Sequence, residues 1–422
     1  MQALSNPIAT DGQRRVEADA IRIFGLPPVQ AAVAEMARRY AAHANARIPE
    51  QAARIRGAAE AGVFHCTVIA ANEDAAAPVI FATELAPHRW MGLEVPDARF
   101  AIDNPDNIYR IMPVDPRWSY RVEARFEGAR PADFNLTVLS EYFGEKGANA
   151  TIGYLDYETL QVDADGGFVL TFDSTPANGR PNHVTLAPQA RFVFFRESLT
   201  DWHGQRAAAM QVSPPPGAIS RPRSDAELAR RAAELALACN SYFFEKVQLG
   251  LYQRGAPNEI VPPIDSGAHG GLVTQIARNL QFALADDEAL VLTVDRLGAR
   301  YFGAQLTDLW TVSYDYSNRL SCLNDFEIAP DADGRCSLVV APRDPGVLNW
   351  LDGGGHRTGG VTLRWQRLPA GTPAASSAVS GRVVKLDHLR EAMPPGTRYA
   401  TPADRARQRN KRAASFAERF SA

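Results

Sequence analysis

The same tetrapeptide occurs twice in this chain and divides it into two halves. Asp163-Ala-Asp-Gly166 and Asp331-Ala-Asp-Gly334 each precede a run of strand-forming residues, at an offset of 331 − 163 = 168 positions. A second echo links residues 114–120 with residues 294–301, each running from Val-Asp to Tyr, at a starting offset of 294 − 114 = 180. We therefore predict two related modules. A chance match between turn-rich hairpins is the alternative.

The first half is predicted to begin with helices and continue as strands. Residues 1–62 carry apolar side chains at helical spacing, which indicates an N-terminal helical segment. From 63 to 205 the period changes to two, in short runs such as 63-VFHCTVIA-70, 118-WSYRVEARF-126 and 191-RFVFF-195. No helical pattern falls between these runs, so an antiparallel sandwich fits better than βαβ units.

The second half follows the same order. Residues 206–223 are dense in Pro, Gly and Ser and are predicted to be a linker, and 224–262 open with a capping box and form a helical segment. Strand-like runs return over 263–369, and 370–422 form a tail, loosely connected at first, with a basic helix. The predicted fold class is mainly β with flanking helices: two antiparallel, jelly-roll-like β-sandwich modules, each preceded by a helical segment.

Charge and hydropathy narrow the classes of partner. The formal net charge is −3 and the pI is about 6.3, so no global basic field exists to bind nucleic acid or an anionic membrane. No apolar run approaches the roughly 18 residues of a spanning helix, and no export signal is recognisable, which predicts a cytoplasmic protein. The basic tail is expected to be a solvated helix or an arm that docks on another subunit, and a homo-oligomer is expected.

No cofactor is predicted from the cysteines or the acidic turns. The four cysteines, Cys66, Cys239, Cys322 and Cys336, lie far apart with no Cys-x-x-Cys pair and are expected to be buried thiols. Both Asp-Ala-Asp-Gly runs lack the third acidic ligand and the downstream glutamate of an EF-hand, so hairpin turns are favoured. A metal ion held by histidines from separate loops stays open.

The densest cluster of candidate catalytic residues is the glycine-rich stretch 343–360 between two strands. Long loops of this kind are often functional. His356 could act as a general acid or base, with Asp352 or Asp344 fixing its tautomer. In the structural alternative, Asp344 caps a turn, Trp350 plugs the sandwich end, and His356 is solvated or bonded to backbone carbonyls.

Seven further residues are predicted to bind substrate. Arginines would hold negative charge and tryptophans would supply an apolar wall. The predicted binding residues are Arg357, Trp350, Asn349, Arg319, Trp310, Tyr109 and Arg110. The leading hypothesis is an acid/base enzyme acting on a small oxygenated molecule, carbohydrate-like or a hydroxylated ring. The alternatives are a non-catalytic ligand-binding or assembly protein and a metal-dependent hydrolase or lyase.

Part of the chain resembles a known family. The motifs 301-YFGAQLTDLW-310, 316-YSNRLSCLNDF-326 and 344-DPGVLNWLDGGGHRTG-359 strongly resemble the bacterial "domain of unknown function 1214" family. The run 104-NPDNIYRIMPVDP-116 looks like the upstream portion of its longer members. The resemblance implies a β-rich, jelly-roll-like domain and supplies no reaction. Many relatives have proline where this chain has Leu348, which affects the stiffness of the loop.

Overall fold

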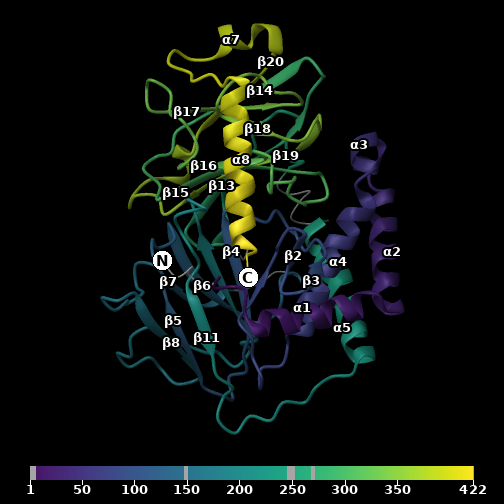
Figure 1. Ribbon diagram of the computed structural model, residues 1–422, viewed down its shortest axis with the longest axis vertical. Helices are drawn as coiled ribbons and strands as arrows, with labels where there is room; N and C mark the ends of the chain where they lie inside the picture. Colours follow the sequence, from purple (N-terminus) through teal and green to yellow (C-terminus); the bar gives the residue numbers. More distant parts are fainter. Residues whose placement is uncertain (1–5, 147–150, 245–251, 268–270, 422) are drawn as a thin grey trace.

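The computed structural model describes residues 6–146, 151–244, 252–267 and 271–421 of the 422-residue chain. Two β-sandwiches are stacked along the long axis of the molecule, and helices of the first quarter of the chain lie along one side (Figure 1). One long C-terminal helix runs across the upper sandwich, and its end lies near Asn6, the first described residue. The Asn6 side chain donates a 2.8 Å hydrogen bond to the backbone oxygen of Arg419, so the two ends of the chain meet.

The first sandwich comprises a five-stranded sheet, ordered β1-β4-β10-β6-β7, and a four-stranded sheet, ordered β11-β5-β8-β9. Apolar residues from both sheets fill the space between them, among them Leu136, Leu170 and Phe195. The strands are β1 (Phe81–Thr83), β4 (Asn107–Pro113), β5 (Tyr120–Arg125), β6 (Asp133–Leu139), β7 (Thr151–Asp156), β8 (Gly167–Asp173), β9 (His183–Thr185), β10 (Phe192–Ser198) and β11 (Ala209–Val212).

The second sandwich comprises a five-stranded sheet, ordered β12-β13-β19-β15-β16, and a four-stranded sheet, ordered β18-β17-β14-β20. Its interior is again apolar and includes Leu292, Leu338 and Trp365. The strands are β12 (Ile264–Asp265), β13 (Gln275–Ala283), β14 (Glu288–Val294), β15 (Tyr301–Thr307), β16 (Cys322–Asn324), β17 (Cys336–Ala341), β18 (Trp350–Asp352), β19 (Thr358–Gln366) and β20 (Val379–Lys385).

Strand by strand, the second sandwich repeats the first. β4 and β13, β5 and β14, and β6 and β15 each begin 168 positions apart, for example at 275 − 107 = 168. Both sandwiches also contain one parallel pair, β8–β9 and β17–β18, and the two Asp-Ala-Asp-Gly turns precede the equivalent strands β8 and β17. The echo at offset 180 is wrong, because residues 114–120 join β4 to β5 whereas 294–301 join β14 to β15. The mainly β class with two sandwich modules is confirmed.

The helices form one group beside both sandwiches instead of two separate segments. Helix α4 (Ile55–Ala71) packs against α1 (Asp11–Phe24), α2 (Pro27–Ala42) and α5 (Asp225–Ser241). The prediction of a strand at 63–70 is therefore wrong. Every residue of α4 from Ala61 to Ala70 is buried. A helix that is apolar all round lacks the helical stripe by which sequence patterns are recognised. The predicted helical segment 224–262 lies partly outside the described residues.

Two predicted irregular segments contain strands. β11 lies within the predicted linker 206–223, and β20 lies within the predicted loose connection of the tail. The predicted basic helix forms as α8 (Pro402–Arg419), after the short α7 (Leu389–Ala392), and a capping box at Thr401 and Asp404 begins it. It docks on the second sandwich of its own chain, where Arg405 and Arg412 are buried. None of the described helices is long and apolar enough to cross a membrane.

The outward faces of the two five-stranded sheets are polar yet buried. In β19, Val361, Leu363 and Trp365 point into the sandwich, so the alternating residues Thr362, Arg364 and Gln366 point outward. Each of these three outward residues is at most 6% exposed. Neighbouring segments and the first sandwich cover this face. Thr362 shares a 2.8 Å hydrogen bond with Tyr252, Arg364 donates to the Ile102 carbonyl oxygen, and Gln366 accepts from Ser198.

Candidate functional site

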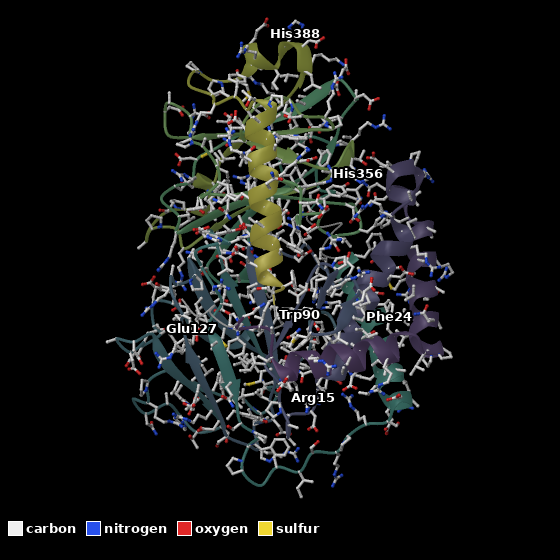
Figure 2. The ribbon with its side chains drawn as sticks, viewed as in Figure 1. Arg15, Phe24, Trp90, Glu127, His356 and His388 are labelled. Carbon is white, nitrogen blue, oxygen red and sulfur yellow. The ribbon has the colours of Figure 1, made fainter. Side chains whose placement is uncertain are left out.

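The structure separates the predicted catalytic residues. His356 lies on the side of the second sandwich that faces α3 (Pro49–Ala52) (Figure 2). Its ring stacks on Tyr314 with centroids 4.6 Å apart, and its Nδ1 atom lies 4.0 Å from an oxygen of Glu50 in α3. Burial, with a smaller contribution from Arg54, lowers the pKa of His356 below its ordinary value. The acid beside His356 is therefore Glu50, not Asp352 or Asp344.

The two predicted aspartates fix the loop and the C-terminal helix. Asp352 is 1% exposed and lies 3.1 Å from Arg409 of α8 and 3.4 Å from Arg319. Asp344 accepts hydrogen bonds of 2.9 Å from both the Gly346 amide and the Arg405 guanidinium. Only Arg319, among the predicted binding residues, forms an ion pair with a predicted catalytic residue. These contacts match the structural alternative in which Asp344 caps a turn.

The tryptophans and Asn349 are engaged in packing. Trp350 is 3% exposed and donates to the Ala341 carbonyl oxygen over 3.1 Å. Asn349 is bonded to both the amide and the carbonyl of Ala329. Trp310 stacks on Tyr40 of α2 with centroids 4.9 Å apart. These side chains join elements of the fold and do not line a common site.

The remaining predicted binding residues diverge. Arg357 points to the surface, where its guanidinium lies 3.6 Å from Asp286. Arg110 points into the first sandwich and forms a buried ion pair with Glu197. Tyr109, the preceding residue of β4, points to the outward face and stacks on Phe194. Adjacent strand residues face opposite sides of a sheet, so these two could not share one pocket.

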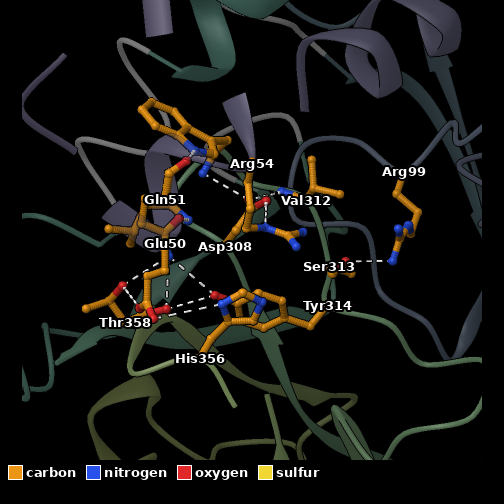
Figure 3. A network of polar contacts seen from close by, with 12 residues as sticks. Glu50, Gln51, Arg54, Arg99, Asp308, Val312, Ser313, Tyr314, His356 and Thr358 are labelled. Atoms are coloured by element: carbon orange, nitrogen blue, oxygen red, sulfur yellow. Dashed lines mark hydrogen bonds and ion pairs between the residues drawn. The ribbon is translucent and has the colours of Figure 1, made fainter. Parts of the chain in front are cut away.

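A network of polar contacts links His356 and Tyr314 with Glu50, Arg54 and Asp308 (Figure 3). Glu50 accepts from the Thr358 hydroxyl and from the Arg357 amide. Asp308 accepts from Arg54 over 2.8 Å and from the Val312 amide over 2.9 Å. Since the charged groups of this network satisfy one another, it serves as a joint between α3 and the second sandwich.

A different pair of residues, absent from the sequence prediction, occupies equivalent positions in the two sandwiches. Arg196 lies on the central strand β10 and Arg364 on the central strand β19, at 364 − 196 = 168. Register places Arg196 between Tyr109 of β4 and Asn135 of β6. Both arginines lie on the outward face, and each is only 6% exposed.

Neither of these arginines forms an ion pair with a described carboxylate. Arg196 stacks over the Phe194 ring at 4.4 Å and makes one long hydrogen bond, 3.4 Å, to the Thr137 hydroxyl. Arg364 donates to the Gln305 side chain and, over 2.6 Å, to the Ile102 carbonyl oxygen. A buried guanidinium without a counter-charge is costly, and its five donors are not all used here.

Two carboxyls lie near these arginines. Burial, reinforced by Asp103, raises the pKa of Glu84 well above its ordinary value, whereas Arg196 and Arg364 both act against that rise. Both guanidiniums are thus close enough to act on the Glu84 carboxyl. The Glu84 residue is partly accessible to solvent. Burial likewise raises the pKa of Asp103 to about 7.

The backbone around these carboxyls is strained. Glu84, Ala101 and Ile102 have φ angles of 61°, 58° and 63°, in the left-handed region that side chains disfavour. For the β-branched Ile102 this conformation is especially unfavourable. Strain of this kind is held in place by surrounding structure and clusters at functional sites.

Unpartnered polar atoms are found at the same place. Asn135 is fully buried, yet neither its amide oxygen nor its amide nitrogen has a hydrogen-bond partner. One oxygen of Asp103 is also buried without a partner. Such atoms call for a bound molecule or ordered water. We name Glu84, Asp103, Asn135, Arg196 and Arg364 the junction site.

The sequence contains one signal that would have found this site. The offset of 168, applied to the run 191-RFVFF-195 and the residues after it, pairs Arg196 with Arg364. No pattern marks Glu84, Asp103 or Asn135, because tertiary structure brings them to the site. Asn135 pairs with Arg196 across the sheet and Glu84 directly follows β1. Asp103 lies in the segment after β3 (Leu93–Val95), which pairs with β2 (His88–Trp90).

Comparisons with known proteins support the fold and name no activity. No family model and no curated protein matches the chain, so the resemblance to the family of unknown function stays a prediction. The chain is similar to the crystal structure of an uncharacterized protein from Burkholderia cenocepacia, with 27% identity and a TM-score of 0.69, covering 89% of this chain and 98% of that one. The VPA0106 protein from Vibrio parahaemolyticus matches at 10% identity and a TM-score of 0.40, over 67% and 90% of the two chains.

Within the described ranges, no group of three or more His, Cys, Asp or Glu side chains is arranged to hold a metal ion. All four cysteines are free and buried, as predicted.

Proposed function

We propose that the protein is an acid/base enzyme that acts on a small, oxygenated organic anion bound at the junction site. The observation that carries this proposal is the pair of equivalent buried arginines, Arg196 and Arg364, which form no ion pair with a described carboxylate and both act electrostatically on Glu84. A ligand that brings negative charge would remove the cost of burying these two guanidiniums. The planar fork of arginine fits the oxygens of a carboxylate or phosphate.

The two carboxyls supply proton-transfer groups of different strength. Burial raises the pKa of Glu84 well above its ordinary value, which favours the protonated carboxyl and suits a general acid. Asp103, with a pKa of about 7, exchanges its proton near neutral pH and suits a general base. Environments that differ in this way are typical of acid/base pairs.

The junction site is a better candidate than His356. The His356 imidazole is stacked on Tyr314 and lies beside a carboxylate that is already bonded to Thr358. A catalytic role for His356 with Asp352 and Asp344 has no contact to support it. The predicted homo-oligomer and cytoplasmic location remain proposals from the sequence.

The test uses the full-length protein and a panel of small organic acids, with binding followed by thermal shift and turnover by mass spectrometry. We expect Glu84→Gln to retain binding and to lose at least about 100-fold in turnover, the scale of general acid catalysis. Glu50→Gln, a carboxyl beside His356, is the matched control and should leave turnover unchanged. Unchanged turnover in Glu84→Gln would contradict the proposal.

The non-catalytic alternative makes a distinct prediction with the same materials. If an acid binds in a manner that depends on Arg196 and no member of the panel is converted, the protein is a ligand-binding protein and the catalytic part of the proposal is wrong.

A further inference from the structure

We infer that the ligand of the junction site is a small dicarboxylate, with one carboxylate bound by Arg196 of the first sandwich and the other by Arg364 of the second. This inference rests on the proposed function and names its substrate class. It follows from the placement of the two arginines, their missing counter-charges and the unpartnered Asn135 amide beside Arg196.

The two sandwiches meet at the ends of their central strands. Ser198 ends β10 and Gln366 ends β19, at 366 − 198 = 168, and their side chains share a 2.8 Å hydrogen bond. Each is tied back to an equivalent strand: Ser198 donates to Asn107 of β4 over 2.8 Å, and Gln366 donates to Gln275 of β13 over 3.2 Å. Equivalent residues of the two sandwiches therefore face each other at this contact.

The second step places the arginines relative to that contact. Arg196 and Arg364 each lie two residues before the strand end, which is about 7 Å along a strand, and on the same face as Ser198 and Gln366. They belong to the two different five-stranded sheets that this contact joins. Arg364 donates to the Ile102 carbonyl oxygen over 2.6 Å, next to Asp103, and Arg196 pairs across the sheet with Tyr109 and Asn135. Both guanidiniums lie near enough to the Glu84 carboxyl to act on it electrostatically.

The third step concerns charge. No described carboxylate forms an ion pair with either guanidinium, so a ligand with one negative group would leave the other cation uncompensated. Two negative groups on separate parts of one molecule satisfy both. A phosphate monoester carries both charges on a single group and fits one guanidinium better than two that approach from different sheets.

The fourth step concerns the middle of the ligand. Asn135, the neighbour of Arg196 across the β6–β10 pairing, keeps a free donor and a free acceptor on the same face. A hydroxyl or carbonyl oxygen between the two carboxylates would bond to this amide. Hydroxy- and oxo-dicarboxylates thus fit better than saturated ones.

The test is titration calorimetry on the full-length protein with defined probes: succinate, glutarate and adipate, their 2-hydroxy forms, butyrate and glycerol phosphate. We expect one dicarboxylate to bind at least tenfold more tightly than butyrate. Arg196→Gln and Arg364→Gln should each weaken that binding at least tenfold, and Asn135→Ala should remove the preference for the hydroxy form.

Matched variants keep the result interpretable. Arg357→Gln, an exposed arginine outside the junction site, should leave binding unchanged. Arg364 also donates a hydrogen bond to the Ile102 carbonyl oxygen, so Arg364→Gln changes a structural contact as well. Arg364→Lys therefore serves as a second variant, which keeps the positive charge and removes the bidentate guanidinium. Equal affinity for butyrate, or dicarboxylate binding that survives Arg196→Gln, would overturn the inference.

Failure of the inference can be distinguished from failure of the proposed function. If glycerol phosphate binds most tightly and both arginine variants weaken its binding, the inferred dicarboxylate ligand is wrong, but the junction site is still an anion-binding site. If binding of none of the probes depends on Arg196 or Arg364, both the dicarboxylate and the proposed function are wrong.

Discussion

The two sandwiches share one strand plan but differ in the charges inside them. In the first, Arg110 of β4 is 2% exposed and pairs with the fully buried Glu197 of β10. At the equivalent positions of the second, 168 residues on, Arg278 binds the Ser377 and Val261 carbonyl oxygens at the rim, and Trp365 occupies the place of Glu197. The first sandwich therefore contains an acid, Glu197, beside its inward-pointing Arg110. The second sandwich has the apolar Trp365 at the position of that acid, and its arginine, Arg278, is bound at the rim.

The outward faces differ less. Both central strands carry an arginine at the same position, Arg196 or Arg364, followed two residues later by a polar residue at the contact between the sandwiches. The comparison shows that the interiors can diverge while the polar outward face stays the same. Since buried arginines without acids do not help folding, this shared feature fits ligand binding better than stability.

The largest expected effect breaks the interior ion pair of the first sandwich. Glu197→Gln leaves the Arg110 charge buried without a partner and should lower the free energy of unfolding by about 3–5 kcal/mol. Arg278→Met, which removes the equivalent of Arg110 in the second sandwich, should cost less than about 1 kcal/mol because that arginine lies at the rim. Denaturant unfolding measures both. Equal losses would mean that the two interiors do not differ as described.

The pH dependence of stability tests the burial of Asp103. The folded-state pKa of about 7 exceeds the unfolded value of 3.8, so the folded chain binds the extra proton between these limits. Stability from this group is greatest below pH 4 and falls as the pH rises toward 7, by at most about 4 kcal/mol. Asp103→Asn should remove this slope and be more stable than the wild type at pH 8. A wild-type stability that rises from pH 4 to 7, with no change in the variant, would contradict the assignment.

The C-terminal helix distinguishes the second sandwich from the first. Arg405 of α8 is 3% exposed and bonds to Asp344 and to the Val347 carbonyl. Arg405→Ala should cost about 2 kcal/mol, the scale of charged hydrogen bonds. Limited proteolysis should then cut the chain near α8 before it cuts the first sandwich. Simultaneous loss of both sandwiches would show that α8 does not stabilise the second one selectively.

The smallest expected effect concerns His356. His356→Ala removes the ring stacking on Tyr314 and should lower the free energy of unfolding by about 1 kcal/mol. Binding and turnover at the junction site should not change. A loss of turnover tenfold or greater in a folded variant would return His356 to the centre of the mechanism.

The sequence predicts the architecture well because turns and strand alternation are local. The Asp-Ala-Asp-Gly turns mark equivalent strands, and the capping box at Ser224 marks the start of a helix. The strand predicted at 63–70 was wrong because a helix buried on all sides has no polar face to reveal its period. β20 was missed because it is an exposed strand with alternation too weak to separate it from a loop.

The site was harder to predict than the fold. The loop 343–360 concentrates polar residues, but Asp344 and Asp352 bond to arginines of α8, a partner that no local pattern identifies. Arg196 and Arg364 become notable only when the two halves are aligned at 168, and Glu84 only when tertiary structure brings it near both arginines. Buried polar residues without partners are a property of packing, which a single sequence does not display.

The most direct test of the central claim is a crystal structure of the full chain grown with the dicarboxylate that binds most tightly in solution. The account predicts electron density for one molecule in contact with both Arg196 and Arg364, with Glu84 beside it. An empty junction site in which Glu84 or Asp103 forms ion pairs with both arginines would contradict the claim that this face binds the ligand.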